Sequence, residues 1–330
     1  MTLPTFSFLT TFYNAESTLS AAIDSSLKQK FEDWEHILVD DGSEDSSADV
    51  ASGYVDNRVL VFQPGKIGRA KALNYGLSKA KGKYIAILDA DDVSEPARLE
   101  KQLELFQQDK SIDLVFGNAN LMDKAGKRFS VTTFGDSHNE FLENLMCFNP
   151  PPASTVTYKK QLIERGVAYN ERCPKSIDFN FYLSCLSKDA NFKGIREAVV
   201  WTTYTHDSWG KADNEFLQIR YAVLGLISLL RFREGSDSFF DLNKEAWASF
   251  LSVYNEWFEK KPFIRQMVAR SLAQKIRTQM SDMTVREICI SVLDVLRTGG
   301  LNILNRKRPI SFHFPKDAEL ASNYFRTKGY

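Results

Sequence analysis

A short apolar run that stops abruptly at acidic residues constrains this chain more than any other feature. Residues 84–88 are apolar, and Asp89, Asp91 and Asp92 follow with only Ala90 among them. Because several unpaired carboxylates are very costly to bury, this pattern predicts a core strand that ends at an open edge with cations nearby. Oxygen ligands on a tight turn suit a hard divalent cation such as Mg²⁺ or Mn²⁺. The alternative is an ordinary polar turn after a core strand, since Asp is a favoured turn residue.

Strand and helix patterns alternate through residues 1–112. Aromatic and β-branched runs predict strands, and apolar residues at helical spacing predict helices between them. The expected strands cover residues 6–12, 34–39, 59–62 and 84–88, and the expected helices cover 19–28, 46–54, 70–80 and a stretch that begins with Ser94 as its cap. This alternation is typical of an α/β fold in which the strands lie mostly parallel, with helices on both faces of the sheet.

Polar clusters follow three of these strands, at residues 11–16, 40–43 and 89–92. In parallel sheets, ligands gather at the carboxyl ends of the strands. Three polar strand ends that converge are better explained by a binding site than by unrelated turns. The sequence disfavours a dinucleotide held by a glycine-rich turn, because Phe12-Tyr13-Asn14 stands where a G-x-G-x-x-G would follow the first strand.

The pattern becomes irregular after residue 112 and helical from about residue 213. Strands are expected at residues 114–117, 129–134 and 153–158, whereas residues 149–152 contain consecutive prolines and cannot be helical. Apolar stripes at helical spacing then predict helices between residues 214 and 297. We therefore expect one domain over residues 1–212, divided near residue 112 where the pattern changes, followed by a helical extension over residues 213–330.

The cysteines and the apolar runs bear on the location of the protein. The four cysteines are scattered without C-x-x-C spacing, which favours a reducing compartment. Residues 1–4 do not begin a recognisable signal peptide, and the longest apolar run, residues 222–230, is too short to span a bilayer. These features predict a cytoplasmic protein.

Charge is balanced overall but not along the chain. Lys plus Arg and Asp plus Glu both total 42, which provides no argument for nucleic-acid binding. Residues 260–310 nevertheless hold 11 basic and 3 acidic side chains. This excess indicates either peripheral contact with an anionic membrane or a solvated basic face.

Four linked motifs resemble those of family 2 glycosyltransferases with the GT-A fold. They are Thr11-Phe12-Tyr13-Asn14-Ala15-Glu16, Val39-Asp40-Asp41-Gly42-Ser43, Asn74-Tyr75-Gly76, and Gly82-Lys83-Tyr84-Ile85 leading into Leu88-Asp89-Ala90-Asp91-Asp92, in the family's order and approximate spacing. The resemblance covers roughly residues 5–210. It implies a GT-A domain with a nucleotide-sugar half (1–112) and an acceptor half (113–212). It also implies a Mn²⁺ or Mg²⁺ cofactor and inversion at the anomeric carbon. The sequence has no Q-x-x-R-W motif, so the resemblance is to a non-processive enzyme.

The resemblance also implies roles for residues on the donor side. Thr11 and Tyr13 would meet the nucleotide base, Tyr13 by stacking. Glu16 and Asp40 would contact ribose and base, with Asp40 accepting a hydrogen bond from the uracil ring N–H. The alternatives are a core position for Tyr13 and, for Glu16, a favourable place near the positive end of the first helix.

Other positions are implied around the diphosphate of the donor. Arg69 and Lys71 would be cations beside it, and Asp89 would face both ribose and metal. Asp91 would bind the metal directly, whereas Asp92 would only brace the turn. The alternative for Lys71 is a solvated helix residue.

The general base is implied by a helix start within residues 175–183. This segment resembles the family's pair of acids, of which the aspartate is the base, but Ile177 replaces the first acid and leaves Asp178 as the candidate. A carboxylate is chemically suited to take the proton of an acceptor hydroxyl. The alternative is an Asp favoured in a first helical turn that Ser176 caps.

A late segment, residues 201–208, resembles the family's strand that ends in Y-x-x-H-x-x-S, with shorter spacing here. His206 would approach the metal or the diphosphate, and its alternative is a structural histidine. Trp209 would stack on a sugar ring or cover the core.

Together these features predict a metal-dependent glycosyltransferase that moves a sugar from a nucleotide-diphosphate donor, a UDP-sugar, to a hydroxyl acceptor. The acceptor would be a glycan or lipid-linked glycan in surface polysaccharide or lipopolysaccharide assembly, with the protein at the inner face of the membrane. One alternative is a catalytically degenerate scaffold, which the Ile177 replacement favours. A sugar-phosphate nucleotidyltransferase is disfavoured, because no G-x-G-T-R loop follows the first strand.

Overall fold

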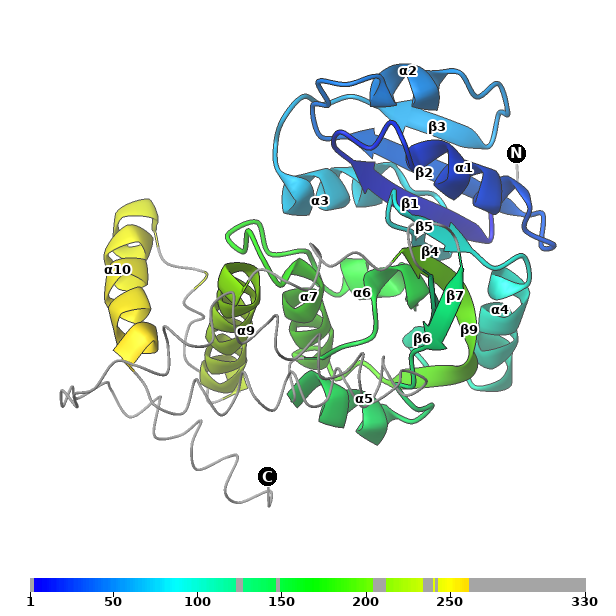
Figure 1. Ribbon diagram of the computed structural model, residues 1–330. Coiled ribbons are helices and arrows are strands. Elements are labelled where there is room, and N and C mark those ends of the chain that lie inside the picture. Colours follow the sequence, from blue (N-terminus) through cyan, green and yellow to red (C-terminus); the bar gives the residue numbers. More distant parts are fainter. Residues whose placement is uncertain are drawn as a thin grey trace.

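The computed structural model describes residues 3–122, 127–146, 149–203, 212–233, 240 and 243–260. Its centre is a nine-stranded sheet with the order β3-β2-β1-β4-β8-β6-β9-β5, and β7 pairs with β6 outside this path (Figure 1). The N-terminal strands β1 (Phe6–Phe12), β2 (Trp34–Asp40), β3 (Val59–Phe62) and β4 (Tyr84–Ile87) are parallel to one another. Their carboxyl ends therefore meet at one edge, as the sequence predicts.

Helices cover both faces of this parallel half, which confirms the predicted α/β arrangement. On one face, α3 (Arg69–Lys79) packs Ala72, Leu73 and Leu77 against Leu9 and Ile37 of the sheet. The helices α1 (Leu19–Leu27), α2 (Ser47–Ser52) and α4 (Arg98–Gln108) lie on the other face. These packed faces hold the strand ends in fixed positions.

The second half of the sheet is mixed. Here β6 (Leu114–Met122) and β9 (Phe192–Thr203) are parallel, whereas β5 (Asp92–Ser94), β7 (Arg128–Val131) and β8 (Thr157–Lys159) pair antiparallel with their neighbours. Because β8 lies between β4 and β6, it joins the two parallel parts into one sheet. The helical elements of this half are α5 (His138–Met146), η1 (Ala153–Thr155), α6 (Gln161–Glu164) and α7 (Ile177–Leu186).

Several predicted boundaries are wrong. The strand expected over residues 114–117 continues to Met122, and the strand expected over residues 129–134 covers Arg128–Val131. Ser94 does not cap a helix: it ends β5, pairs with Val200 of β9, and α4 begins at Arg98 after Ala97. Pairing with a strand that lies far along the chain overrides the local Ser-Glu-Pro signal. The strand expected over residues 153–158 begins at Thr157, because residues 153–155 form the 3₁₀-helix η1.

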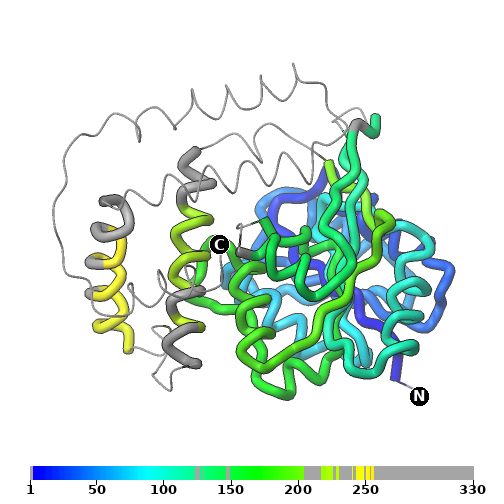
Figure 2. Tube along the Cα trace, turned by 90° about the horizontal axis from the view of Figure 1, so that it is seen from below, coloured from blue at the N-terminus to red at the C-terminus, as the bar shows by residue number. Residues whose placement is uncertain are grey.

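The described part of the C-terminal extension is helical, as predicted. The helix α9 (Ala212–Arg233) packs against α7, and α10 (Lys244–Lys260) lies farther from the sheet (Figure 2). The Tyr254 hydroxyl of α10 donates a hydrogen bond of 2.6 Å to the Arg220 carbonyl oxygen of α9. The division at residue 212 stays a prediction, and Ala222 of α9 packs within the main core.

The described residues include only part of the chain for the predictions about cysteines, membrane-spanning helices and the basic segment. Cys173 and Cys185 are buried free thiols, whereas Cys147 and Cys289 lie outside the described residues. Among the described helices, none has the length and apolar character needed to cross a bilayer. Nearly all of the basic segment 260–310 lies outside the described residues.

Candidate active site

The acidic turn, which we define as residues 89–92, leaves the end of β4 at the centre of the sheet edge. Carboxylate oxygens of Asp89, Asp91 and Asp92 lie within 4.8 Å of one another. The Asp89 N–H donates to Ser154 Oγ at 2.9 Å, and the Asp92 N–H donates to the Asp89 carbonyl oxygen at 3.1 Å. Pairing of Asp92 with Thr202 anchors the far side of the turn to β9. The three carboxylates of the acidic turn therefore form one cluster, which both β4 and β9 hold in place.

Burial and mutual repulsion destabilise the ionised carboxylates of the acidic turn when no cation is bound. Burial, followed by the charges of Asp91 and Asp89, raises the pKa of Asp92 well above its usual range. Loss of hydration and then the charge of Asp89 raise the pKa of Asp91, which lies at the exposed rim. A hard divalent cation fits this set of carboxylate oxygens and would relieve the repulsion. Asp92 is 4% exposed and is strand-bound, which agrees with a bracing role.

Arg69 supplies a positive charge to the site. It is the first residue of α3, and its Nη2 donates to Asp89 Oδ1 at 2.7 Å. The charge of Asp89, and then those of Asp178 and Asp91, raise the pKa of Arg69. Arg69 therefore lies close both to the acidic turn and to Asp178, the predicted base. By contrast, Lys71 is exposed two residues later, about 200° around the helix axis from Arg69, so α3 does not present both cations to one point.

Asp41 positions Arg69, a role that the sequence did not reveal. Asp41 Oδ1 accepts hydrogen bonds from the backbone N–H groups of Ile67 at 2.8 Å and Gly68 at 2.7 Å. Gly68 has a φ of 90°, a conformation that favours glycine, and immediately precedes Arg69. The only sequence signal was the place of Asp41 beside Asp40 in the second motif.

Asp178 lies in the first turn of α7. Burial and the charge of Asp89 raise the pKa of its carboxyl group, while the Arg69 guanidinium lowers it. Ser176, the residue before the helix, does not cap it: the Ser176 hydroxyl donates instead to the Gln218 carbonyl oxygen at 2.6 Å. Ile177 is 9% exposed and packs in the core. The replacement of the first acid thus leaves Asp178 as the acid that this helix start contributes to the site.

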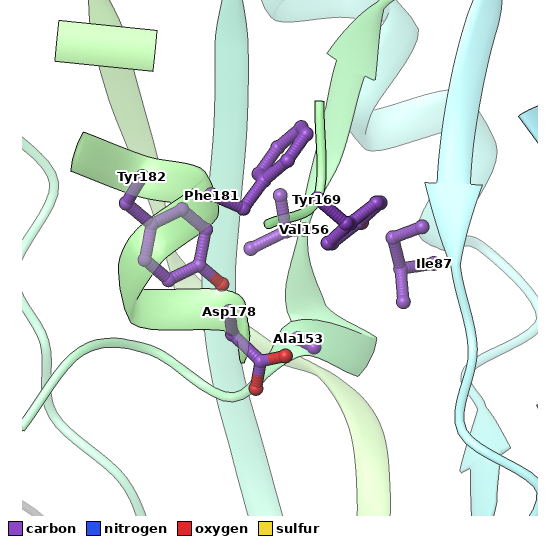
Figure 3. Close-up of a pocket in the computed structure, with 7 residues that line it drawn as sticks. All are labelled: Ile87, Ala153, Val156, Tyr169, Asp178, Phe181 and Tyr182. Carbon is purple, nitrogen blue, oxygen red and sulfur yellow. The ribbon is translucent and has the colours of Figure 1, made fainter. Parts of the chain in front are cut away.

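A small pocket lies beside Asp178 (Figure 3). Its walls are mainly apolar and aromatic, and the Asp178 carboxylate lies at one end. The lining residues are Ile87, Ala153, Val156, Tyr169, Asp178, Phe181 and Tyr182. The rings of Tyr169 and Phe181 stack with centroids 4.3 Å apart, and the Tyr182 hydroxyl donates to the Pro151 carbonyl oxygen at 3.2 Å.

Asn74 connects this pocket to α3. Its Nδ2 donates to the Tyr169 carbonyl oxygen at 2.9 Å and to Glu171 Oε1 at 3.1 Å, while its Oδ1 accepts from the Tyr169 N–H at 3.0 Å. These bonds hold the segment that carries Tyr169 against the helix that carries Arg69. The third sequence motif therefore has a structural role here.

The residues predicted to bind the base and ribose lie at the ends of β1 and β2. Tyr13 is 41% exposed, so the core alternative is wrong. The Lys66 ammonium donates to Tyr13 Oη at 2.8 Å and lies 4.0 Å from the ring centroid. Asp40 is buried and accepts from the Ser43 N–H, whereas Glu16 is exposed and accepts from the Ser46 N–H.

Thr11 is half-buried at the end of β1. His206 and Trp209 lie outside the described residues. The predicted third metal contact and the predicted sugar-stacking ring therefore stay predictions.

Comparison with known proteins places the chain in a family. Residues 7–160 match glycosyl transferase family 2. An uncharacterized glycosyltransferase of Haemophilus influenzae is 35% identical over 207 residues, which cover 61% of this chain and 77% of that protein. The chain belongs to glycosyl transferase family 2. The chain is also similar to the Escherichia coli UDP-Glc:alpha-D-GlcNAc-diphosphoundecaprenol beta-1,3-glucosyltransferase WfgD, which is 28% identical over 64% of this chain and 82% of its own length.

Solved structures support the fold of this family 2 member. The S. aureus TarS fragment 1–349 has a TM-score of 0.56 at 17% identity, with 90% of this chain and 82% of that chain covered. The mannosyltransferase PcManGT from Pyrobaculum calidifontis, solved with GDP-Man and Mn²⁺, has a TM-score of 0.52 at 12% identity, covering 100% and 88%. At these identities the likeness shows the fold, and the predicted GT-A fold is confirmed.

Proposed function

We propose that this family 2 glycosyltransferase is a metal-dependent, inverting enzyme that transfers a sugar from a UDP-sugar to a hydroxyl acceptor. One observation carries the proposal: the acidic turn, Arg69 and Asp178 come from distant parts of the chain and meet at the carboxyl edge of the sheet. A site with metal ligands, a cation and a separate carboxylate matches the needs of a displacement at an anomeric carbon with a diphosphate leaving group.

On the donor side, the exposed Tyr13 ring offers a stacking surface for the base beside Thr11. Asp40 would accept from the uracil ring N–H, and Glu16 would contact the ribose. A uridine donor is supported by relatives and neighbours: TarS structures contain UDP and UDP-GlcNAc, and the name of WfgD specifies UDP-Glc. The GDP-Man in PcManGT shows that this fold also accepts a purine nucleotide in another protein.

Asp91 and Asp89 would hold Mn²⁺ or Mg²⁺, with Asp92 bracing the turn from its buried position. When bound, the metal would neutralise charge on the leaving diphosphate. Arg69, already beside Asp89, would face the same diphosphate as a second positive charge. Lys71 and His206 stay predicted diphosphate and metal contacts, and Lys71 would have to reach the donor from the solvent-facing side of α3.

The reaction would use Asp178 as the general base. The acceptor hydroxyl oxygen forms a bond to the anomeric carbon while the bond between that carbon and the diphosphate oxygen breaks, and the electron pair leaves with the diphosphate. Asp178 takes the hydroxyl proton. Because attack and departure occur on opposite sides, the anomeric configuration inverts. Burial raises the pKa of Asp178, which increases its proton affinity, and Arg69 favours the ionised form that a base requires.

The acceptor would be a glycan or a lipid-linked glycan in surface polysaccharide or lipopolysaccharide assembly. The diphosphoundecaprenol acceptor in the name of WfgD supports this class. The protein would work at the inner face of the membrane, with the basic segment 260–310 near anionic lipid.

A thermal-stabilisation screen tests the donor assignment. The full chain is heated with nucleotide-sugars that carry uridine, guanosine or other bases, each with and without MnCl₂. A bound donor raises the melting temperature by mass action, so UDP-sugars should stabilise the protein only when Mn²⁺ is present. Equal stabilisation with and without metal would contradict the metal assignment, and a guanosine preference would contradict the UDP assignment.

A further inference from the structure

Arg98 is a fully buried cation of α4 that contacts the last residue of β4. Its Nη2 donates to the carbonyl oxygens of Ile87 at 2.9 Å and Val156 at 3.0 Å, and its Nε donates to Gln102 Oε1 at 3.2 Å. Its Nη1 makes no hydrogen bond within the described residues, and the charge of Asp92 acts on the guanidinium. A charge this costly to bury indicates a function beyond filling the core.

Gln102 lies one helical turn after Arg98 and binds the same part of the sheet. Residues four apart on a helix lie on the same face, so Arg98 and Gln102 point to the same part of the sheet. Gln102 is also fully buried: its Nε2 donates to the Thr155 carbonyl oxygen at 2.9 Å, and its Oε1 accepts from the Thr157 hydroxyl at 2.6 Å. The two side chains therefore bind backbone and hydroxyl groups of residues 155–157.

These contacts join two segments that form the candidate active site. Ile87 ends β4, two residues before Asp89, and it lines the Asp178 pocket together with Ala153 and Val156. Ser154 lies between Ala153 and Val156, and its hydroxyl oxygen accepts a hydrogen bond from the Asp89 N–H. A shift of this segment would therefore move both a pocket wall and the first acid of the acidic turn.

We propose that Arg98 and Gln102 are a positioning pair, which sets the spacing between the acidic turn and residues 153–157 and thereby the affinity for a metal-bound nucleotide. This inference rests on the proposed function. The pair acts through the backbone at Ile87, Thr155 and Val156 rather than by touching the donor.

The test compares full-length Arg98→Lys, Gln102→Leu and Thr157→Val with the unmutated protein. Calorimetry measures the Kd for UDP at saturating MnCl₂ and the Mn²⁺ concentration needed for half-maximal UDP binding, and thermal unfolding measures stability. Loss of a residue that supports metal ligands typically weakens metal binding about 10–100-fold, so Arg98→Lys and Gln102→Leu should need at least about tenfold more Mn²⁺ for half-maximal UDP binding. Thr157→Val is nearly isosteric and should also weaken Mn²⁺-dependent UDP binding. It provides the same test if the larger changes prevent folding.

Ser7→Ala is the matched control. It removes a buried hydroxyl that donates to Glu35 at 2.6 Å, near the amino ends of β1 and β2 and away from the site. The positioning role predicts a lower melting temperature for this variant, but an unchanged Mn²⁺ requirement and an unchanged Kd for UDP. Pair variants that bind Mn²⁺ and UDP normally would overturn the inference, as would a Ser7→Ala variant that loses affinity equally. An unmutated protein that binds no UDP with Mn²⁺ would refute the donor assignment itself, and the inference with it.

Discussion

Lowering the pH should destabilise the protein through His36, a buried residue of β2. His36 is fully buried, its Nε2 lies 2.9 Å from Thr10 Oγ1, and its Nδ1 lies 2.9 Å from Ser26 Oγ. The Thr10 hydroxyl donates to the Leu88 carbonyl oxygen at 2.6 Å, directly before the acidic turn. Burial lowers the pKa of His36 from 6.5 to about 3, so the folded protein keeps this ring neutral.

The magnitude follows from this pKa difference. The unfolded chain binds a proton at His36 below pH 6.5 whereas the folded chain does not, so the contribution of His36 to stability is complete above pH 6.5 and is lost as the pH falls. Between pH 6.5 and about 3 the loss is about 1.4 kcal/mol per pH unit. From pH 7.5 to pH 5, His36 alone should therefore lower the free energy of unfolding by about 2 kcal/mol.

Urea unfolding of the wild type and His36→Gln at pH 7.5 and pH 5 measures this contribution. The variant should be less stable at pH 7.5, because Gln fills the site imperfectly, but it should lose about 2 kcal/mol less than the wild type on acidification. Comparing the two proteins removes the contributions of the carboxyl groups, which both share. An equal loss in both proteins would refute the assignment of a neutral, buried His36.

Three further predictions concern the site, helix packing and the membrane. Asp178→Asn should keep the donor Kd but lower transfer by about two to four orders of magnitude, because an amide cannot accept the proton; wild-type transfer would remove Asp178 as the base. Gly225→Ala should lower the free energy of unfolding by about 1–3 kcal/mol, because a Cβ there would lie 2.2 Å from Asn180 Oδ1, and an unchanged urea midpoint would contradict the close α7–α9 contact. If residues 260–310 meet membrane, the protein should sediment with anionic vesicles at low salt and release at high salt, and equal binding to neutral vesicles would indicate no electrostatic contact.

Local patterns predicted the parts of the site that depend on the strand ends. The apolar residues 84–88 predicted a core strand. The carboxylates that follow predicted a turn at the sheet edge, because unpaired carboxylates are too costly to bury with the strand. The alternation of strands and helices then placed Tyr13, Asp40 and Asp89 at one edge. The position of Asp178 near that edge came from the family resemblance, since no local pattern links α7 to β4.

Features that depend on distant pairing were not predictable from one sequence. Ser94 has the local signature of a helix cap, but it pairs with Val200 of β9 and forms the last residue of β5. No local pattern marks Arg98 and Gln102, because the backbone groups that they bind lie elsewhere in the chain. Asp41 likewise acquires its role only when residues 67 and 68 fold against it.

Metal-dependent release of UDP from UDP-glucose and UDP-GlcNAc, measured for the wild type and Asp91→Asn, tests the central claim most directly. The wild type should release UDP from at least one of these donors with Mn²⁺, and the release should stop when the metal is chelated. Asp91→Asn should retain the fold by thermal unfolding, yet should lose Mn²⁺-dependent UDP binding and release UDP at least about 100-fold more slowly. A variant that releases UDP at the wild-type rate would contradict the metal site, and a wild type that binds UDP with Mn²⁺ but never turns over either donor would indicate a binding protein instead of a transferase for these sugars.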